Sequence, residues 1–314
     1  MTSAVTAAPL TARLSTCSFK GDFDACRALC DSVDRFVAPE IEHWLIVPAR
    51  DLPLFAPLAG ARRRVVSEDD YLPRWFFRAP MPSPRWRARL GLPRRNVYLT
   101  PYSLPVRGWI AQQMIKIAAT AAATTDVVVH VDSDNAFIRP FGPERIVRGD
   151  RVRLYRDPKP TDTSGHRLWH AAAGRLLGLP PSDFYDAEYI DALVVWRRSS
   201  LVAMIARIEQ VTGKRWDVAL ARTPHFAEYV LYGVHADKVT GLDAAGLYAD
   251  DRSLCHSRWT ENFDSAADED AFVASVRPEQ VSCLIQSTIP LSLERRLDLY
   301  RRVEAQAARQ DAGA

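Results

Sequence analysis

The sequence predicts an α/β domain with a mostly parallel, partly mixed central sheet flanked by helices. Two observations carry this prediction. Apolar runs of strand length alternate with amphipathic helical patterns from residue 13 onward, which is the βαβ pattern of a helix-covered sheet. The composition, 47% hydrophobic and 25% charged, is typical of an ordinary folded domain. No composition break marks a linker, so we expect a flexible N-terminus over residues 1–12 and one domain over residues 13–311.

The first half of the chain alternates strands and helices. Its apolar and helical patterns predict strands at residues 13–19, 43–47, 64–66 and 126–131, and helices at 23–37 and 107–123. Asp51 is placed to cap a short helix. The proline-rich stretch 71–105 reads as irregular, and loops of that length in compact domains are often functional.

The second half continues in the same way. It predicts strands at residues 151–155, 192–196 and 282–285, and helices at 166–177, 201–211, 225–232 and from residue 291 onward. Ser199 and Ser200 are residue types that cap helices, so we expect them to begin the helix at 201–211.

Charge is unevenly distributed along the chain. The net charge of +3 is too small to indicate a nucleic-acid partner. Residues 61–95 nevertheless hold ten arginines and three acidic residues, interleaved with Trp75, Phe76, Phe77 and Trp86. This stretch is either a solvated segment packed by its own aromatics or a contact surface for an anionic acceptor, stacked bases or a membrane. A peripheral membrane contact through 61–95 therefore stays open.

The cysteines and the apolar runs indicate the cellular compartment in which we expect the protein. Five cysteines include no C-x-x-C pair, and Cys26 and Cys30 share a predicted apolar helix face. No secretory signal and no run of about 20 apolar residues is present in the sequence. We therefore expect a cytoplasmic protein.

The sharpest chemical signal is an acidic pair. The β-branched run ending at Val131 continues as Asp132-Ser133-Asp134, which places two carboxylates at the carboxyl end of a central strand, where open α/β sheets bind ligands. Such oxygens suit Mg²⁺ or Mn²⁺, completed by phosphate oxygens and water. Two other interpretations remain: an ordinary strand-to-turn exit, or the Asp-x-Asp motif of phosphatases, in which the first acid is a nucleophile.

Two segments carry a resemblance to a known family. Gly108–Lys116 and Val129–Phe137 resemble the donor-site half of GT-A glycosyltransferases and, more narrowly, a bacterial family of glycosyltransferases with undefined substrate. The resemblance also covers residues 16–22, 227–233 and 283–287. It implies a Rossmann-like GT-A domain with a nucleotide-binding half (13–140) and an acceptor-binding half (141–311).

The resemblance also implies ligands and roles. The donor would be a nucleoside-diphosphate sugar, UDP- favoured over GDP-, and the cofactor Mn²⁺ or Mg²⁺. The metal ligands would be Asp132, Asp134 and His256. The nucleotide, diphosphate or sugar would contact Thr16, Ser18, Lys20, Asp22, Gln112, Lys116, Asp132, Ser133, Arg258 and Trp259. Two alternatives stay open: Lys116 as a solvated helix lysine, and His256 as a core histidine bonded to backbone.

A catalytic base is needed if the reaction inverts stereochemistry, because the acceptor hydroxyl must lose its proton. Glu228 is our candidate, and a glutamate paired with an arginine is the alternative. Asp191 is a second candidate; with Asp186 and Glu188 it forms an acidic group that would otherwise bind acceptor hydroxyls. The expected function is sugar transfer to a hydroxyl acceptor, such as a natural product or polysaccharide. The alternative is a non-catalytic sugar or nucleotide binder.

Overall fold

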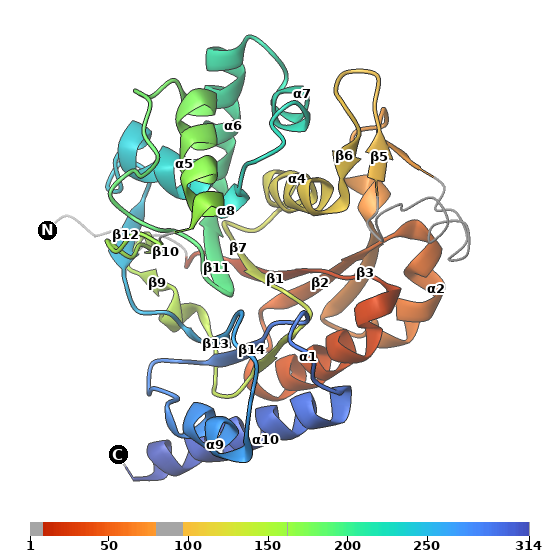
Figure 1. The fold of residues 1–314 in the computed structure, drawn as a ribbon, viewed down its shortest axis with the longest axis vertical. Helices are drawn as coiled ribbons and strands as arrows, with labels where there is room; N and C mark the ends of the chain where they lie inside the picture. Colours follow the sequence, from red (N-terminus) through yellow and green to blue (C-terminus); the bar gives the residue numbers. More distant parts are fainter. Residues whose placement is uncertain (1–8, 80–96, 162, 314) are drawn as a thin grey trace, which may run out of the picture.

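A five-stranded sheet forms the centre of the molecule. The structure is a computed structural model that describes residues 9–79, 97–161 and 163–313. The strand order is β11-β7-β1-β2-β3, and all pairings are parallel except that of β11 with β7 (Figure 1). These strands are β1 (Ala12–Cys17), β2 (Glu42–Val47), β3 (Arg63–Ser67), β7 (Val127–Val131) and β11 (Leu193–Arg197). Every residue of β1 and β7 is buried, as expected for strands covered on both faces.

Helices cover both faces of the central sheet (Figure 1). On one face, buried residues of α1 and α2 pack on Leu45 and Val47 of β2. On the other, Ile115 and Ala119 of α4 pack on Cys17 and Ile46. The described helices are α1 (Phe23–Phe36), α2 (Leu52–Phe55), α4 (Gly108–Ala121), α5 (Ser164–Leu177), α6 (Arg198–Thr212), α7 (Trp216–Ala221), α8 (Glu228–Val234), α9 (Ala266–Ala274), α10 (Leu293–Ala312) and the π-helix η6 (His235–Thr240). Short 3-10 turns span Lys20–Asp22, Ala49–Asp51, Ala56–Leu58, Glu68–Asp70 and Pro143–Arg145.

Three small sheets surround the central one. Their strand orders are β12-β10-β9, β13-β14-β8 and β4-β5-β6. Their strands are β4 (Phe77–Arg78), β5 (Val97–Leu99), β6 (Val106–Arg107), β8 (Asn135–Phe137), β9 (Val147–Arg148), β10 (Arg151–Tyr155), β12 (Leu247–Asp250), β13 (Cys255–Arg258) and β14 (Ser282–Ile285). The sheet of β13, β14 and β8 shares a separate apolar core with α9 and α10, seen below the central sheet in Figure 1.

The structure confirms the α/β class and a central sheet that is mainly parallel. The strands and helices predicted in both halves are present, with bounds shifted by a few residues. The stretch 71–105 is not wholly irregular, because β4, β5 and β6 pair as an antiparallel sheet. Strands of two or three residues carry too little periodicity to be recognised in a sequence.

One cap assignment was wrong, and a second, Asp51, holds the N-cap position of α2 without using its side chain. Helix α6 begins at Arg198, directly after β11, and Ser200 is buried inside it. Asp51 makes no cap bond with its side chain; its Oδ2 accepts a hydrogen bond from the backbone N of Lys20 at 2.9 Å. Both cases are tertiary effects, since the sequence pattern shows a suitable residue type but not the contact that uses it.

The arginine-aromatic stretch 61–95 is described only in part, and Trp86 lies outside the described residues. In the described part, Trp75 packs against Phe76 and Tyr102, with ring centroids 4.6 and 5.0 Å apart. Phe77 is 61% exposed. Trp75 and Phe76 therefore pack against aromatic neighbours, whereas Phe77 faces solvent. Among the described residues, no helix is long and apolar enough to cross a membrane.

Candidate functional site

The acidic pair lies where β7 ends, at the carboxyl edge of the central sheet. Asp132 follows the last residue of the strand, and the chain turns back at once, with the backbone N of Asn135 donating to the Asp132 carbonyl at 3.2 Å. The Asp132 side chain is 40% exposed, whereas Ser133 is buried. The Asp132 carboxylate is therefore open to solvent, while a backbone hydrogen bond holds the turn that carries it.

A buried lysine neutralises part of this charge. Lys116 of α4 places its Nζ 3.1 Å from Asp132 Oδ1 and 3.3 Å from Glu228 Oε1, and it donates to the Tyr229 hydroxyl at 2.7 Å. Burial alone would lower the pKa of Lys116, but the negative potential of Asp132, Tyr229 and Glu228 outweighs it, and the pKa is raised well above its ordinary value. The lysine is a charged member of the site, so its interpretation as a solvated helix lysine is wrong.

Glu228 is the first residue of α8 and is buried beside Lys116. Burial raises its pKa, and the neighbouring ammonium only partly opposes this. Its backbone N donates to Gln113 Oε1 at 3.1 Å, while Gln113 Nε2 is buried without a hydrogen-bond partner in the described chain. The carboxylate thus pairs with a lysine rather than an arginine. Gln113 contacts the backbone of Glu228, whereas the neighbouring Gln112, predicted to face the donor, is half-buried.

Asp134 is held by the C-terminal part of the chain. Its Oδ2 accepts from the backbone N of Ser287 at 2.8 Å, and its carbonyl accepts from the hydroxyl of Tyr300. Burial, with the nearby charge of Asp132, raises the pKa of Asp134 to about 6. A carboxyl in this state gains from a cation, which would offset both effects.

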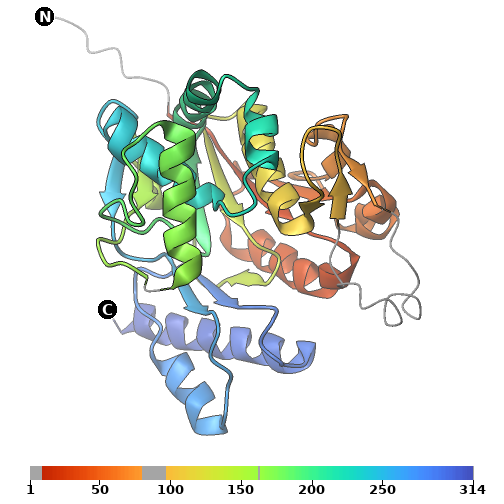
Figure 2. The same cartoon turned by 45° about the horizontal axis from the view of Figure 1, so that its top comes forward.

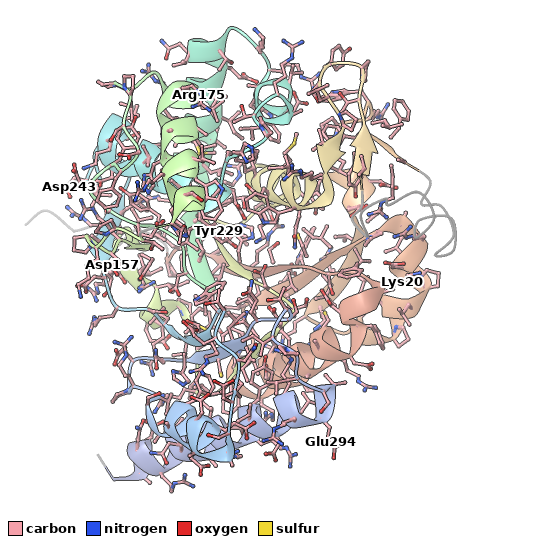
Figure 3. The ribbon with its side chains drawn as sticks, in the orientation of Figure 1. Lys20, Asp157, Arg175, Tyr229, Asp243 and Glu294 are labelled. Atoms are coloured by element: carbon pink, nitrogen blue, oxygen red, sulfur yellow. The ribbon has the colours of Figure 1, made fainter. Side chains whose placement is uncertain are left out.

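The turn after β1 contributes only some of its predicted residues. Asp22 accepts a hydrogen bond from Ser133, and burial, together with the charge of Asp132, raises its pKa. Ser18 is buried, and Lys20 is exposed. Figure 3 shows Lys20 at the right side of the molecule and Tyr229 near its centre. Asp22 and Ser133 therefore join the site.

Thr16 is not brought to the site. It is fully buried in β1, where its hydroxyl bonds to His43 Nε2 at 3.0 Å. A residue in a strand that is covered on both faces contacts core side chains rather than a ligand. Its predicted contact with the nucleotide is therefore not supported.

The predicted residues His256, Arg258 and Trp259 make their described side-chain contacts away from the two carboxylates. His256 Nε2 donates to the Phe272 carbonyl at 2.8 Å, and its ring stacks on Phe272 at 4.1 Å. The Arg258 guanidinium is bonded to the carbonyls of Glu261 and Asn262 and to Asp268. Trp259 packs against the main core. His256 as a third metal ligand was therefore wrong; it is the core histidine bonded to backbone.

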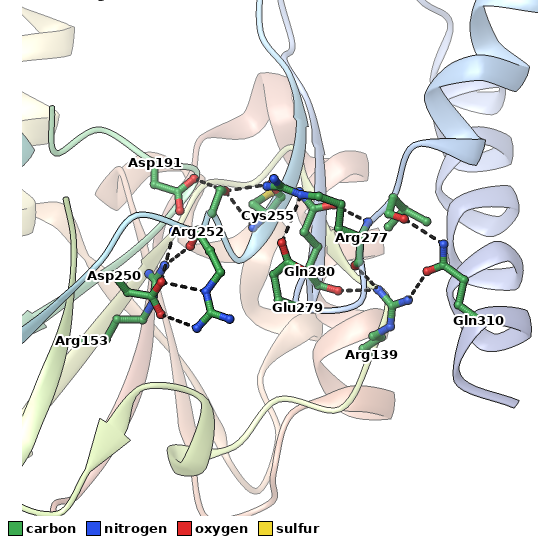
Figure 4. Close-up of polar contacts among 12 residues, drawn as sticks. Arg139, Arg153, Asp191, Asp250, Arg252, Cys255, Arg277, Glu279, Gln280 and Gln310 are labelled. Carbon is green, nitrogen blue, oxygen red and sulfur yellow. Dashed lines mark hydrogen bonds and ion pairs between the residues drawn. The ribbon is translucent and has the colours of Figure 1, made fainter. Parts of the chain in front are cut away.

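The second acidic group does not form one cluster. Asp186 is exposed and pairs with Lys238 at 2.9 Å, whereas Glu188 pairs with His166. Asp191 Oδ1 accepts from Ser253 Oγ at 2.7 Å and from the backbone N of Ala192 at 2.8 Å (Figure 4). Burial raises the pKa of Asp191 to about 6.

Leu193 of β11 pairs with Val131 of β7 in antiparallel register, and the pairing ends there. No described contact joins Asp191 to the acidic pair. Two depressions in the surface of the described residues have volumes of about 350 Å³, between α9 and α10, and about 510 Å³, along α5. Neither Asp191 nor the acidic pair lines either of them.

A divalent cation can be accommodated only with help from a ligand. The described residues contain no group of three or more His, Cys, Asp or Glu side chains arranged for a metal. Asp132 and Asp134 lie within each other's electrostatic influence, and Asp132 also acts on Asp22. Mg²⁺ is commonly held by one or two carboxylates with phosphate oxygens and water, so the pair fits an ion that arrives with a phosphorylated substrate.

Comparison with known proteins gives one family. The model described as "Family of unknown function (DUF6492)" matches residues 2–302, which includes every residue of the site described above. No curated protein matches the chain.

Proposed function

The chain belongs to the DUF6492 family, and we propose that it is a metal-dependent glycosyltransferase of the GT-A type. The donor is a nucleoside-diphosphate sugar, with UDP- favoured over GDP-, and the acceptor is a hydroxyl group. The observation that carries the proposal is the buried Lys116 held between Asp132 and Glu228 at the carboxyl end of β7. Open α/β sheets bind their ligands at this edge.

The charges of the site support a cation and a diphosphate together. Asp22, Asp132, Asp134 and Glu228 supply up to four negative charges, against the positive charge of Lys116. Arg296 adds a second positive charge that acts on Asp22 and Asp134. Asp132 and Asp134 would hold the ion, which would supply charge stabilisation for the leaving diphosphate. Lys116 remains protonated beside the same carboxylate, and a positive group there favours negative charge that develops on the diphosphate.

Glu228 is the base in an inverting reaction. In that reaction the acceptor oxygen bonds to the anomeric carbon, the bond from that carbon to the diphosphate oxygen breaks, and Glu228 takes the hydroxyl proton. Its raised pKa makes it a stronger base than an exposed glutamate, and Lys116 stabilises its ionised form. A retaining reaction would not require this role of Glu228 or of Asp191.

Donor hydrolysis tests the proposal. Purified protein with Mn²⁺ and a panel of UDP- and GDP-sugars should slowly release nucleoside diphosphate. Asp134→Ala and Asp132→Asn should each lower the rate at least about a hundredfold, because each removes a charge that holds the ion. Asp243→Asn is the matched control, since Asp243 is 82% exposed and pairs only with Arg151 in the described contacts.

A non-catalytic binder is the second candidate. The ion pair of Lys116 with Asp132 favours it in one respect, because the pair partly satisfies both charges without a ligand. Binding of a sugar nucleotide without turnover, even when acceptors are present, would support the non-catalytic binder. Release of phosphate from a phosphomonoester instead would support the phosphatase interpretation of Asp132.

A further inference from the structure

Three aromatic rings form a row at the outer end of α4. Trp109 is the second residue of α4 and is 47% exposed. Its ring centroid is 5.8 Å from that of Trp169 on α5, and Trp169 is 4.5 Å from the ring of His166. We call Trp109, Trp169 and His166 the aromatic row. Trp169 and His166 are half-buried, so Trp109 is the exposed member of a row of adjoining rings, a combination that marks a contact surface.

A buried carboxylate fixes the histidine of this row. Glu188 is 6% exposed in its side chain and bonds to His166 Nδ1. Burial would raise the pKa of Glu188, but the bond and the charge of His166 outweigh it, and the pKa is lowered. An ionised carboxylate only accepts hydrogen bonds, so His166 Nδ1 carries the proton. Within residues 9–79, 97–161 and 163–313, no hydrogen bond uses the Nε2 of His166, so this nitrogen is available to a ligand.

A second nitrogen beside the same carboxylate also lacks a partner. His170 is 1% exposed, and its Nδ1 accepts from the backbone N of Tyr185 at 3.4 Å. Its Nε2 lies 4.0 Å from Glu188 Oε2, beyond hydrogen-bond distance, and makes no hydrogen bond within the described chain. Buried polar atoms are normally satisfied, so an ordered water or a ligand hydroxyl is expected here.

The aromatic row lies on the same side of α4 as the proposed donor site. Trp109 precedes Lys116 by seven residues, which is about two helical turns or roughly 10 Å along the axis. Helix α8 contacts both α4 and α5, and the Trp109–Trp169 contact also joins these two helices (Figure 2). A molecule on the row is therefore within the length of one or two sugar rings from the lysine.

We infer that the aromatic row, with the His166–Glu188 pair, is a binding subsite for a pyranose ring of the acceptor. The C–H face of such a ring packs on indole faces, and one of its hydroxyls can donate to His166 Nε2. Binding of the sugar follows from these residues alone; its role as acceptor rests on the proposed function.

The test measures sugar binding without donor or metal. Methyl glycosides of glucose, galactose, mannose and N-acetylglucosamine are titrated into the full chain, and saturation-transfer NMR reports the bound face. At least one should bind with its C–H face in contact. Trp169→Ala and Trp109→Ala should each weaken binding about tenfold or more, since such rings dominate recognition.

Variants separate the contributions. His166→Phe keeps a ring but removes both nitrogens, the Nδ1 that bonds Glu188 and the Nε2 that faces the ligand, and should weaken binding by about tenfold or more. Trp169→Phe should retain part of the binding, which shows that the alanine variant has not simply unfolded. Leu168→Ala, at a 49% exposed position of the same helix, is the control and should bind as the natural chain does.

The outcomes distinguish the subsite from the proposed function. A separate calorimetric titration of UDP with Mn²⁺ reports the donor site. If UDP binds but no glycoside does, or if Trp169→Ala binds sugar unchanged, the subsite is wrong and the transferase proposal stands. If sugars bind through the row but no sugar nucleotide binds or is hydrolysed, the subsite stands and the transferase proposal fails.

Discussion

Two buried cations in this molecule have opposite surroundings. Arg139 is 2% exposed, and every guanidinium nitrogen donates to a partner at 2.7–3.0 Å: the carbonyls of Arg277 and Gln280, and the side chains of Gln310 and Asp311 (Figure 4). Lys116 instead faces two carboxylates and a phenol, with no backbone carbonyl among its described contacts.

The difference separates a structural charge from one placed for a ligand. Around Arg139 the partners are mainly carbonyls, so donors and acceptors balance and nothing further is needed. Around Lys116 the carboxylates outnumber the cation, burial raises the pKa of both Glu228 and Asp134, and Gln113 Nε2 has no described partner. Excess charge and unused hydrogen-bonding capacity are what a bound cation and substrate would relieve.

The largest expected effect is on stability at the balanced cation. Arg139→Leu should lower the free energy of unfolding by about 3–5 kcal/mol, because it leaves the carbonyls of Arg277 and Gln280 buried and unpaired. Urea denaturation measures this. Arg35→Leu is the control, since Arg35 forms an exposed pair with Glu304 and should cost less than about 1 kcal/mol. If Arg139→Leu and Arg35→Leu lost the same free energy of unfolding, the distinction between a buried, fully bonded arginine and a surface ion pair would be contradicted.

The unbalanced cation should matter more for activity. Lys116→Met should lower kcat for donor hydrolysis about a hundredfold, equivalent to about 2.7 kcal/mol, because it removes the positive charge beside the diphosphate position. Lys238→Met is the control; Lys238 pairs with Asp186 and Asp237 away from the acidic pair. Full activity in Lys116→Met would make this lysine structural as well.

Asp191 tests a buried carboxyl that makes no ion pair in the described chain, although the charge of Arg153 partly opposes the effect of burial. Its pKa is raised from 3.8 to about 6 by burial, so its contribution to stability is fully present below pH 3.8 and is lost as the pH rises through 6. Asp191→Asn cannot ionise and should gain on the order of 2–3 kcal/mol relative to the natural chain between pH 4 and pH 7. Urea denaturation at each pH measures the free energy of unfolding of both chains. A difference between them that stays the same at every pH would contradict the raised pKa of Asp191.

The smallest effect concerns the cation site itself. Because the pKa of Asp134 is about 6, protons compete with Mn²⁺ below that pH and not above it. Affinity for Mn²⁺ in the presence of UDP should fall about tenfold per pH unit below 6 and stay level from 7 to 8. Calorimetry measures this, and Asp134→Asn should bind weakly with no such slope. A slope centred near pH 4 would indicate an ordinary exposed carboxylate.

The sequence was sufficient to predict the strands of the central sheet and the place of Asp132 at the end of one of them. β7 is a run of β-branched residues, so its end, and therefore Asp132, could be located. The resemblance to GT-A glycosyltransferases implied a role for Lys116 on the preceding helix. Gln113 could not be separated from Gln112, because neighbouring residues of a helix differ by only 100° in direction and the exact phase depends on packing against α8.

His256 shows why the rest could not be predicted. Neighbouring residues of a strand face opposite sides, so Cys255 and His256 point to different cores. Which side faces the acidic pair depends on the pairing of β13 with β14 and on α9, which covers the histidine. Neither β13 nor α9 gave a pattern clear enough to predict. The aromatic row was missed for a similar reason, since Trp109 and Trp169 meet only in the folded chain.

The bonds from Ser287 and Tyr300 to Asp134 span 153 and 166 residues of sequence. During synthesis β7 and its acidic turn are therefore exposed long before the segment that holds Asp134 exists. A nascent chain that has completed its central sheet still lacks a fixed Asp134, and cation affinity should appear only after α10 docks. Refolding monitored by bound Mn²⁺ would then lag behind the recovery of helical signal, which makes the ion a reporter of the last folding step.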